Sequence, residues 1–211
     1  TSTRGRRGGW LLGLLCLVGG ALGLVQNSRA EEVEEPRFAL VRKYSDFEIR
    51  RYAPSVIART EVRASRERSL GKGFRRLASF IFGKNAAQMS IAMTAPVGRL
   101  PSKDGFHVTF TMPASHSLKT LPAPDDPRVE ILRVPSRVVA ALAFSGWARE
   151  ARVEVQMARL AGAMKKRGLP ALGPPELAQY DAPWVPGPMR RNEILVPTRV
   201  PAQAPTAPGG P

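Results

Sequence analysis

One stretch of the chain, residues 69–82, reads SLGKGFRRLASFIF, and it decides the fold class. Its large apolar side chains recur at the spacing of a single helix face, at Leu70, Phe74, Leu77 and Ile81. The basic residues between them fall elsewhere on the same helix, and Gly83 follows as a stop signal. The spacing predicts a helix from about Arg66 to Phe82.

The residues before this helix have a different period. Three short runs with alternating apolar side chains occur at 38–41, 47–52 and 56–62. Ser45-Asp46 and Ala53-Pro54 separate them, and such residues are typical of turns. The pattern predicts a meander of three strands that leads into the helix.

The same order of elements returns after the helix. An extended stretch at Met89–Val97, a strand at Phe106–Met112 and a proline-rich loop at 113–127 precede two more strands, at 129–134 and 138–144. A second set of helically spaced apolar residues follows, at Val153, Met157, Leu160 and Met164, and Gly168-Leu169-Pro170 ends it. Two helices on a curved antiparallel sheet predict an α+β domain built from one duplicated unit, with a groove between sheet and helices.

Both ends of the chain are unlike the middle. Residues 1–30 contain a basic stretch, an apolar run at 10–25 and small residues near Ala30, which predicts a signal peptide and export to a periplasmic, secreted or organelle-luminal compartment. The run is shorter than the about 20 residues of a spanning helix, so stable membrane insertion after cleavage is not expected, although an uncleaved anchor stays open. Residues 31–36 form an acidic spacer, 37–200 the folded domain, and 201–211 a tail of expected disorder.

Charge and cysteine content limit the classes of function. Cleavage after Ala30 would remove Cys16, the one cysteine, and would lower the net charge from +15 to +11. The domain would then hold neither a disulfide nor a thiolate metal site. A positive excess favours anionic partners, but the few aromatic residues are not interleaved with the basic ones, so nucleic acid is not expected.

The sequence contains no constellation typical of catalysis. It lacks a histidine pair at metal-ligand spacing, a Gly-x-Ser-x-Gly elbow and a phosphate-binding glycine loop. His107 alternates within a strand and is interpreted as structural or solvated, whereas His116 lies in a loop and is freer to reach a ligand. We therefore expect no enzyme and no metal site, and an enzyme acting on a porphyrin or small ester stays a distant alternative.

Three local strings combine unusual composition with a recognisable order. Met89–Val97 alternates methionine with aliphatic side chains, which suits a flat apolar ligand but equally suits ordinary core packing. Residues 122–127 form a stiff proline loop before a strand. Tyr180-Asp181-Ala182-Pro183-Trp184 precedes Arg190–Ile194, whose arginines suit either a pocket rim or a solvated strand end.

These strings, taken in order, resemble the SOUL haem-binding family. The matching patterns are Y-x-x-F-E-I-R-x-Y from Tyr44, I-x-M-T-x-P-V from Ile91, the proline loop, F-x-G-x-A from Phe144, and Y-D-x-P from Tyr180 followed by R-R-N-E from Arg190. The resemblance covers about Phe38 to Val196. It implies a distorted antiparallel β-barrel flanked by two helices, shared with GyrI-like domains, and binding of haem or another tetrapyrrole.

The resemblance also suggests where a tetrapyrrole would lie. We expect Met89, Ile91 and Met93 on the wall of an apolar slot, Phe74 or Leu77 on a helical lid, and Arg190 or Arg191 near the propionates. Some family members are thought to use a histidine near the start of the domain as axial ligand, and residues 44–62 contain none. His116, a methionine or Tyr180 are the alternative axial ligands. Haem could also bind without any axial ligand from the protein. A module for another planar or amphipathic anion, or for a protein partner, stays open, as does the oligomeric state.

Overall fold

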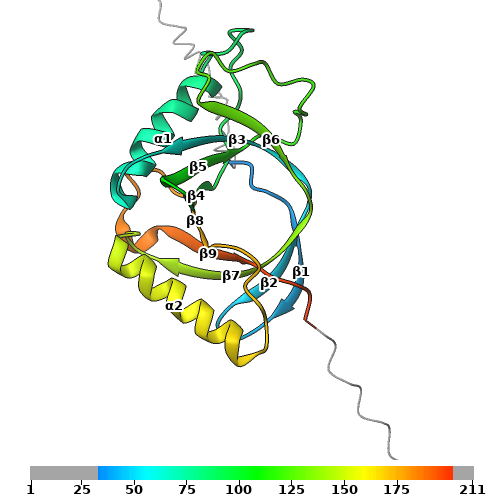
Figure 1. Cartoon of the computed structure of the whole chain (residues 1–211), viewed down its shortest axis with the longest axis vertical. Helices are drawn as coiled ribbons and strands as arrows, with labels where there is room; N and C mark the ends of the chain where they lie inside the picture. The colour runs from blue at the N-terminus through cyan, green and yellow to red at the C-terminus, as the bar shows by residue number, and fades with distance from the viewer. Residues whose placement is uncertain (1–32, 202–211) are drawn as a thin grey trace, which may run out of the picture. The chain divides into compact units, whose positions relative to one another are not determined.

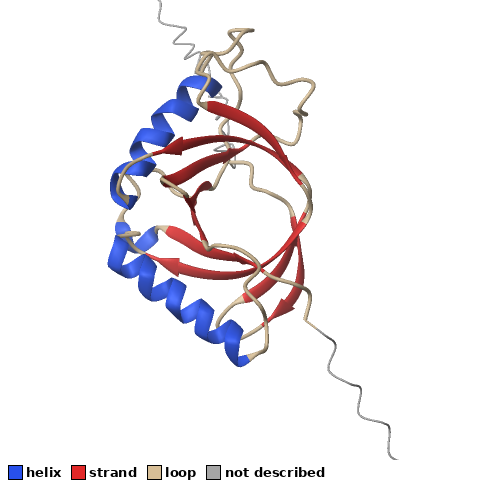
Figure 2. Ribbon diagram, viewed as in Figure 1, coloured by secondary structure: helices blue, strands red, loops and turns tan. Residues whose placement is uncertain are grey.

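The computed structural model describes residues 33–201, and the expected signal segment and most of the expected tail lie outside them. In this range the chain forms nine strands, two α-helices and one 3-10 turn: β1 (Phe38–Lys43), β2 (Glu48–Tyr52), β3 (Ser55–Val62), α1 (Arg66–Ile81), β4 (Val97–Ser102), β5 (Gly105–Thr111), β6 (Val129–Val134), β7 (Arg137–Ser145), α2 (Glu150–Lys166), β8 (Glu176–Gln179), η1 (Gly187–Met189) and β9 (Arg191–Pro197). Figure 2 shows the helices and strands by colour.

All nine strands belong to one antiparallel sheet with the order β1-β2-β7-β9-β8-β4-β5-β3-β6. The sheet curls, but its edge strands β1 and β6 do not pair with each other, so it is an open half-barrel. Both helices cover its convex outer side (Figure 1). The α+β class and the two flanking helices predicted from the sequence are confirmed, and the barrel is open.

The duplication predicted from element order is visible in the sheet. β3-α1-β4-β5 and β7-α2-β8-β9 have the same internal order, and β4 pairs with β8 where the two units meet. The strand before each unit pairs with the other unit, because β2 joins β7 and β6 joins β3. This exchange ties both halves into one sheet.

Each helix buries one apolar face on its half of the sheet. α1 packs on a cluster that includes Phe80, Val108 and Phe110, and α2 packs on one that includes Ile49, Leu142 and Ile194. Glycines with positive φ end both helices, Gly83 at +103° and Gly168 at +66°, a conformation that other residues adopt at a cost. The two helices therefore begin and end close to where their spacing and stop signals predict.

The inner face of the half-barrel holds a third, smaller cluster of Tyr52, Val139, Ala141, Ala178 and Leu195, with Tyr180 packed against it. Successive side chains of a strand point to opposite faces, so the residues that alternate with the helix-covered ones line the concave side. All three clusters and every strand pair form among residues 33–201, so this domain has a complete core of its own. No helix in the described range is long and apolar enough to cross a membrane.

Candidate functional site

Two neighbouring cavities lie at the open end of the half-barrel, where β3 begins and β5 ends, and the larger takes wall residues from both faces of the sheet. The larger measures about 500 Å³, and its wall includes Val56, Met112, Pro113, Leu118 and His116. The smaller measures about 210 Å³ and reaches deeper along the inner face, past Tyr52, Leu100 and Leu195. Pro36, Ala53, Ser55 and Thr111 line both. Ligand cavities are commonly about 300–1,000 Å³ with mostly apolar walls, and the larger cavity fits that description.

Basic side chains surround the larger cavity. Arg37, Lys119 and Arg133 line it together with two carboxylates of the N-terminal segment, Glu34 and Glu35. The donor set thus combines an apolar wall, one imidazole and three cations, which suits an amphipathic anion and is compatible with a haem group. In the described range no three histidine, cysteine, aspartate or glutamate side chains gather as a metal site would require.

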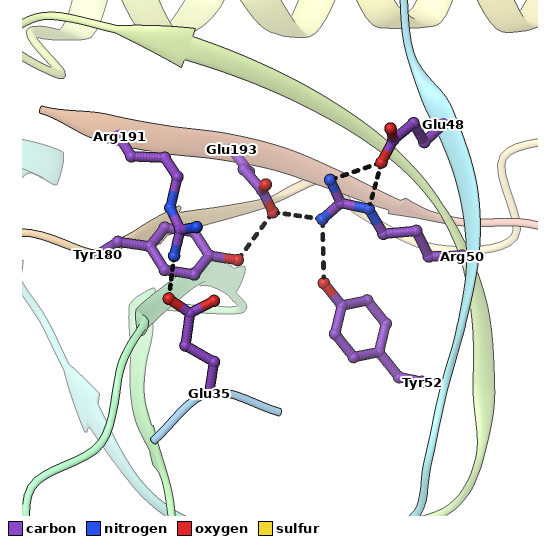
Figure 3. A network of polar contacts seen from close by, with 7 residues as sticks. All are labelled: Glu35, Glu48, Arg50, Tyr52, Tyr180, Arg191 and Glu193. Carbon is purple, nitrogen blue, oxygen red and sulfur yellow. Dashed lines mark hydrogen bonds and ion pairs between the residues drawn. The ribbon is translucent and has the colours of Figure 1, made fainter. Parts of the chain in front are cut away.

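A buried polar network lies on the inner face beside these cavities (Figure 3). Arg50 Nη1 donates to Glu193 Oε2 at 2.9 Å, and the Tyr180 hydroxyl donates to the same oxygen at 2.8 Å. Arg50 Nε also donates to Glu48 Oε2 at 2.8 Å, and Arg50 Nη1 lies 3.4 Å from the Tyr52 hydroxyl. Glu193 and Arg50 are both buried, so each charge depends on the other for compensation.

The network keeps its groups in defined protonation states. Burial raises the pKa of the Tyr180 hydroxyl, and the adjacent Glu193 charge raises it further. Burial also raises the pKa of Tyr52. Burial alone would lower the pKa of Arg50, but its hydrogen bond and charge interaction with Glu193 outweigh burial and raise it. At neutral pH both phenols are therefore protonated donors and the arginine is a cation.

The N-terminal segment, residues 33–37, crosses the concave side and is called the strap below (Figure 1). Ala95 N donates to Glu34 O at 2.9 Å, and Ala114 N donates to Glu34 Oε1 at 2.8 Å. The Glu35 carboxylate pairs with the Arg191 guanidinium, which stacks 3.7 Å from the centre of the Tyr180 ring. The strap is thus held at both of its glutamates.

Four of the residues expected to form the slot lie in a closed part of the molecule. Leu77, on the inner face of α1, and Ile91 are fully buried in the cluster between α1 and the sheet. Phe74 and Met89 pack against this cluster. The four residues line neither cavity, because α1 seals these side chains between helix and sheet. The expectation of an open slot at these four residues is therefore wrong, and the cavities lie at the end of the sheet.

The string Ile91–Val97 has a structural role that explains its alternation. Ile91 points into the core, whereas Met93 points outward and is 38% exposed. The Thr94 hydroxyl donates to Thr111 O at 2.5 Å and so fixes the string to β5. Ile91 N also donates to Ile81 O at the end of α1. The string joins α1 to the sheet, and any contact of its methionines with a ligand stays a prediction.

The two arginines differ in position. Arg190 is buried, donates to the carbonyls of Pro183 and Val185, and stacks 3.8 Å from the centre of the Trp147 ring. It shapes the loop before β9 and does not face the concave side. Arg191 faces the concave side and pairs there with the Glu35 carboxylate, and its position near a propionate stays a prediction.

The two histidines also differ in position. His116 lines the larger cavity. His107 lies on β5 opposite Glu61, with its buried Nδ1 atom unpaired among the described residues. Burial lowers the pKa of His107, and the nearby Arg59 charge lowers it further. His116, the histidine that the sequence places in a loop, is therefore the one that lines the larger cavity.

Sequence reasoning missed Arg50, Tyr52 and Glu193 as candidate site residues. The available signal was strand alternation, since Arg50 and Tyr52 alternate with Ile49 and Arg51 in β2, and Glu193 alternates with Asn192 and Ile194 in β9. That alternation shows which residues share a face. It does not show that β2 and β9 face one cavity from either side of β7.

Comparison with solved structures reveals the same fold in proteins of very different sequence. The C-terminal domain of EcmrR matches with a TM-score of 0.56 at 12% identity, over 79% of this chain and 99% of that one. An uncharacterized conserved protein from Listeria innocua matches with a TM-score of 0.54 at 11% identity, over 80% and 94% of the two chains. At such identities the likeness concerns the fold alone.

Comparison at the sequence level gives the family. No curated protein sequence matches the chain. The family model described as SOUL heme-binding protein matches residues 33–197, which include every strand and helix of the domain. The chain belongs to the SOUL heme-binding protein family.

Proposed function

We propose that this protein binds haem or a related tetrapyrrole without catalysing a reaction, and that the ligand occupies the larger concave cavity. The observation that carries the proposal is the composition of this cavity, in which an apolar wall, His116 and three cations occur together. Membership of a heme-binding family supports the class of ligand. The residues of this chain would supply the apolar contact, the charge pairing and the imidazole.

The energetics of such a site are favourable but not dominated by one term. Burial of roughly 500 Å² of apolar ligand surface at about 25 cal/mol per Å² contributes on the order of 12 kcal/mol. Association costs about 4–15 kcal/mol, so burial alone does not ensure tight binding. Charge-assisted bonds to carboxylates contribute about 1.5–3 kcal/mol each. Arg37, Lys119 and Arg133 therefore decide the affinity for an anionic ligand.

The test is a titration of ferric haem into residues 31–211, followed by the Soret band. We expect a saturable spectral change, and His116→Ala should alter the position of the bound band if the imidazole reaches the iron. His107→Ala is the matched control, because His107 lies outside the larger cavity. A band identical to that of free haem at every protein concentration would overturn the proposal.

A second pair of variants tests the location. Leu118→Glu places a charge on the apolar wall of the cavity and should weaken haem binding at least about tenfold. Ala161→Glu makes the same change in a surface hollow of about 650 Å³ beside α2, which has an apolar lining with Met157 and Met164. Loss of binding in the second variant alone would move the site to that hollow.

The alternative ligand is another planar or amphipathic anion. Metal-free protoporphyrin separates the two cases, because it offers the same apolar body and carboxylates without iron. Equal affinities of both compounds and an unshifted Soret band in every variant would favour the alternative.

A further inference from the structure

The contacts of Arg191 resemble those of a ligand-binding side chain. Its guanidinium stacks 3.7 Å from the centre of the Tyr180 ring, and its backbone N donates to the Asp181 carboxylate. The stacking and the backbone anchor hold the guanidinium at the edge of the concave side. Its carboxylate partner, Glu35, comes from the strap, which belongs to neither a strand nor a helix (Figure 3).

Other arginines of the concave side are paired within the sheet. Arg59 on β3 meets Glu130 on β6 at 2.6 Å, and Arg137 on β7 meets Glu176 on β8 at 2.8 Å. In both pairs the two partners are carried by strands of the sheet, β3 and its neighbour β6 in one case, and β7 and β8 on either side of β9 in the other. Arg191 differs, because its partner Glu35 lies in the strap, before the first strand, and is not carried by the sheet.

The strap also forms part of the cavity wall. Glu35 lines the larger cavity and Pro36 lines both cavities. The side chains of Arg191 and Glu35 are 47% and 42% exposed, so a carboxylate from solution can reach the guanidinium. Arg191 and Tyr180 do not line the larger cavity, but Glu35 lines it and also pairs with Arg191, so this guanidinium lies directly behind one wall residue of the cavity.

We propose that Arg191 and Tyr180 form a carboxylate-binding subsite next to the larger cavity, behind Glu35, and that Glu35 occupies it as an internal substitute for the ligand's carboxylate. The strap and an anionic ligand then compete for one guanidinium. Ligands of this subsite have an apolar body and a terminal carboxylate. The inference rests on the proposed function in its choice of cavity, but its test does not require haem.

The test compares pyrenebutyrate with pyrenebutanol, which share an apolar body and differ in the carboxylate. Titrations of residues 31–211, followed by pyrene fluorescence, should show that Glu35→Gln tightens pyrenebutyrate binding about 2- to 5-fold, because an exposed ion pair is a weak competitor. Arg191→Gln should weaken it about 5-fold or more, since a charge-assisted bond is lost. Neither change should alter pyrenebutanol binding, and the double variant should behave like Arg191→Gln.

The matched control is Glu150→Gln. It removes the same charge from another arginine pair, because Glu150 meets Arg66 at 3.3 Å between the two helix starts. Tightening of pyrenebutyrate by this variant would mean that net charge alone acts, and it would overturn the subsite. Unchanged pyrenebutyrate affinity in Glu35→Gln, equal changes with pyrenebutanol, or no pyrenebutyrate binding at all would overturn it too.

Haem titrations of the same variants separate this inference from the proposed function. If the affinities for haem and for pyrenebutyrate are both unchanged in Glu35→Gln and Arg191→Gln, the subsite is overturned and the proposed function stands. Pyrenebutyrate discrimination without any haem binding leaves the subsite and overturns the function.

Discussion

At the scale of single residues, Gly73 sets the distance between α1 and the sheet. A Cβ atom placed on Gly73 would lie 2.4 Å from Val108 Cγ2 and 2.5 Å from Val108 Cβ. Val108 is fully buried on β5, so it has no free space into which to move. Close contact between the helix backbone and the strand thus requires glycine at this one position of α1.

Gly73→Ala should therefore lower the free energy of unfolding by about 1–3 kcal/mol, the usual cost of overpacking a core. Gly71→Ala is the control two residues earlier in the same helix, where a Cβ would meet only the end of the Arg75 side chain at 3.8 Å. It should raise stability by about 0.5–1 kcal/mol through helix propensity. Urea unfolding checks both, and equal effects of the two variants would contradict the close-contact explanation.

At the scale of elements, Asp126 fixes the end of the long loop before β6. Its carboxylate accepts from Arg128 N at 3.0 Å and from Arg128 Nε at 2.8 Å, and it lies 3.5 Å from Arg76 Nε on α1. The hydrogen bonds from Arg128 lower the pKa of Asp126 to about 2, and the Arg76 charge adds to this. One carboxylate thus connects a loop, the start of a strand and a helix.

Asp126→Asn should lower the free energy of unfolding by up to about 1 kcal/mol at neutral pH, since the ion pairs are partly exposed. The pKa is lower in the folded state, so the wild-type carboxylate stabilises the fold above about pH 4 and loses this effect as pH falls through about 2. Urea midpoints at pH 6 and pH 2 measure the difference. The exposed Asp125→Asn serves as control at pH 6, and a wild-type advantage that persists undiminished at pH 2 would contradict the assignment.

Several elements could be predicted because their signals are local. Both helices follow from apolar residues at helical spacing and from a glycine stop, and these depend on contacts a few residues apart. The sequence predicts no definite boundaries for β4 and β8. Val97–Ser102 contains a glycine and a proline, and Glu176–Gln179 is only four residues long. Pairing between these two strands fixes them in the sheet, and a local pattern does not contain that pairing.

At the scale of the whole domain, the exchange of β2 and β6 between the two units makes one sheet of two repeats. α1 stabilises one half and α2 the other, yet each half completes its sheet with the strand that precedes the opposite unit in the chain. We therefore expect the domain to unfold in one cooperative transition.

Leu77→Ala tests this cooperativity, because Leu77 lies on the buried face of α1 while both tryptophans of residues 31–211, Trp147 and Trp184, lie in the second half. Loss of this buried side chain should cost about 2–5 kcal/mol. The urea midpoints from tryptophan fluorescence and from circular dichroism should shift together. Leu160→Ala, on the buried face of α2, should shift both midpoints in the same way. If Leu77→Ala left the midpoint from tryptophan fluorescence unchanged, the two halves would unfold separately.

The sequence by itself determined the fold class, the two helices, the repeat of elements and the family resemblance, because each depends on residue spacing along the chain. The sequence offered Arg191 only as an alternative to Arg190 near the propionates. It offered His116 only as one of several alternative axial ligands. The tertiary structure decided where the cavities lie. A strand pattern separates two faces but does not say which one a helix will cover, and here α1 covers the sheet face of Ala58, Val108 and Phe110. The meeting of Glu35 with Arg191 and Tyr180 also depends on tertiary structure, since pairing of β8 with β9 brings the last two together but only the folded half-barrel places the strap beside them.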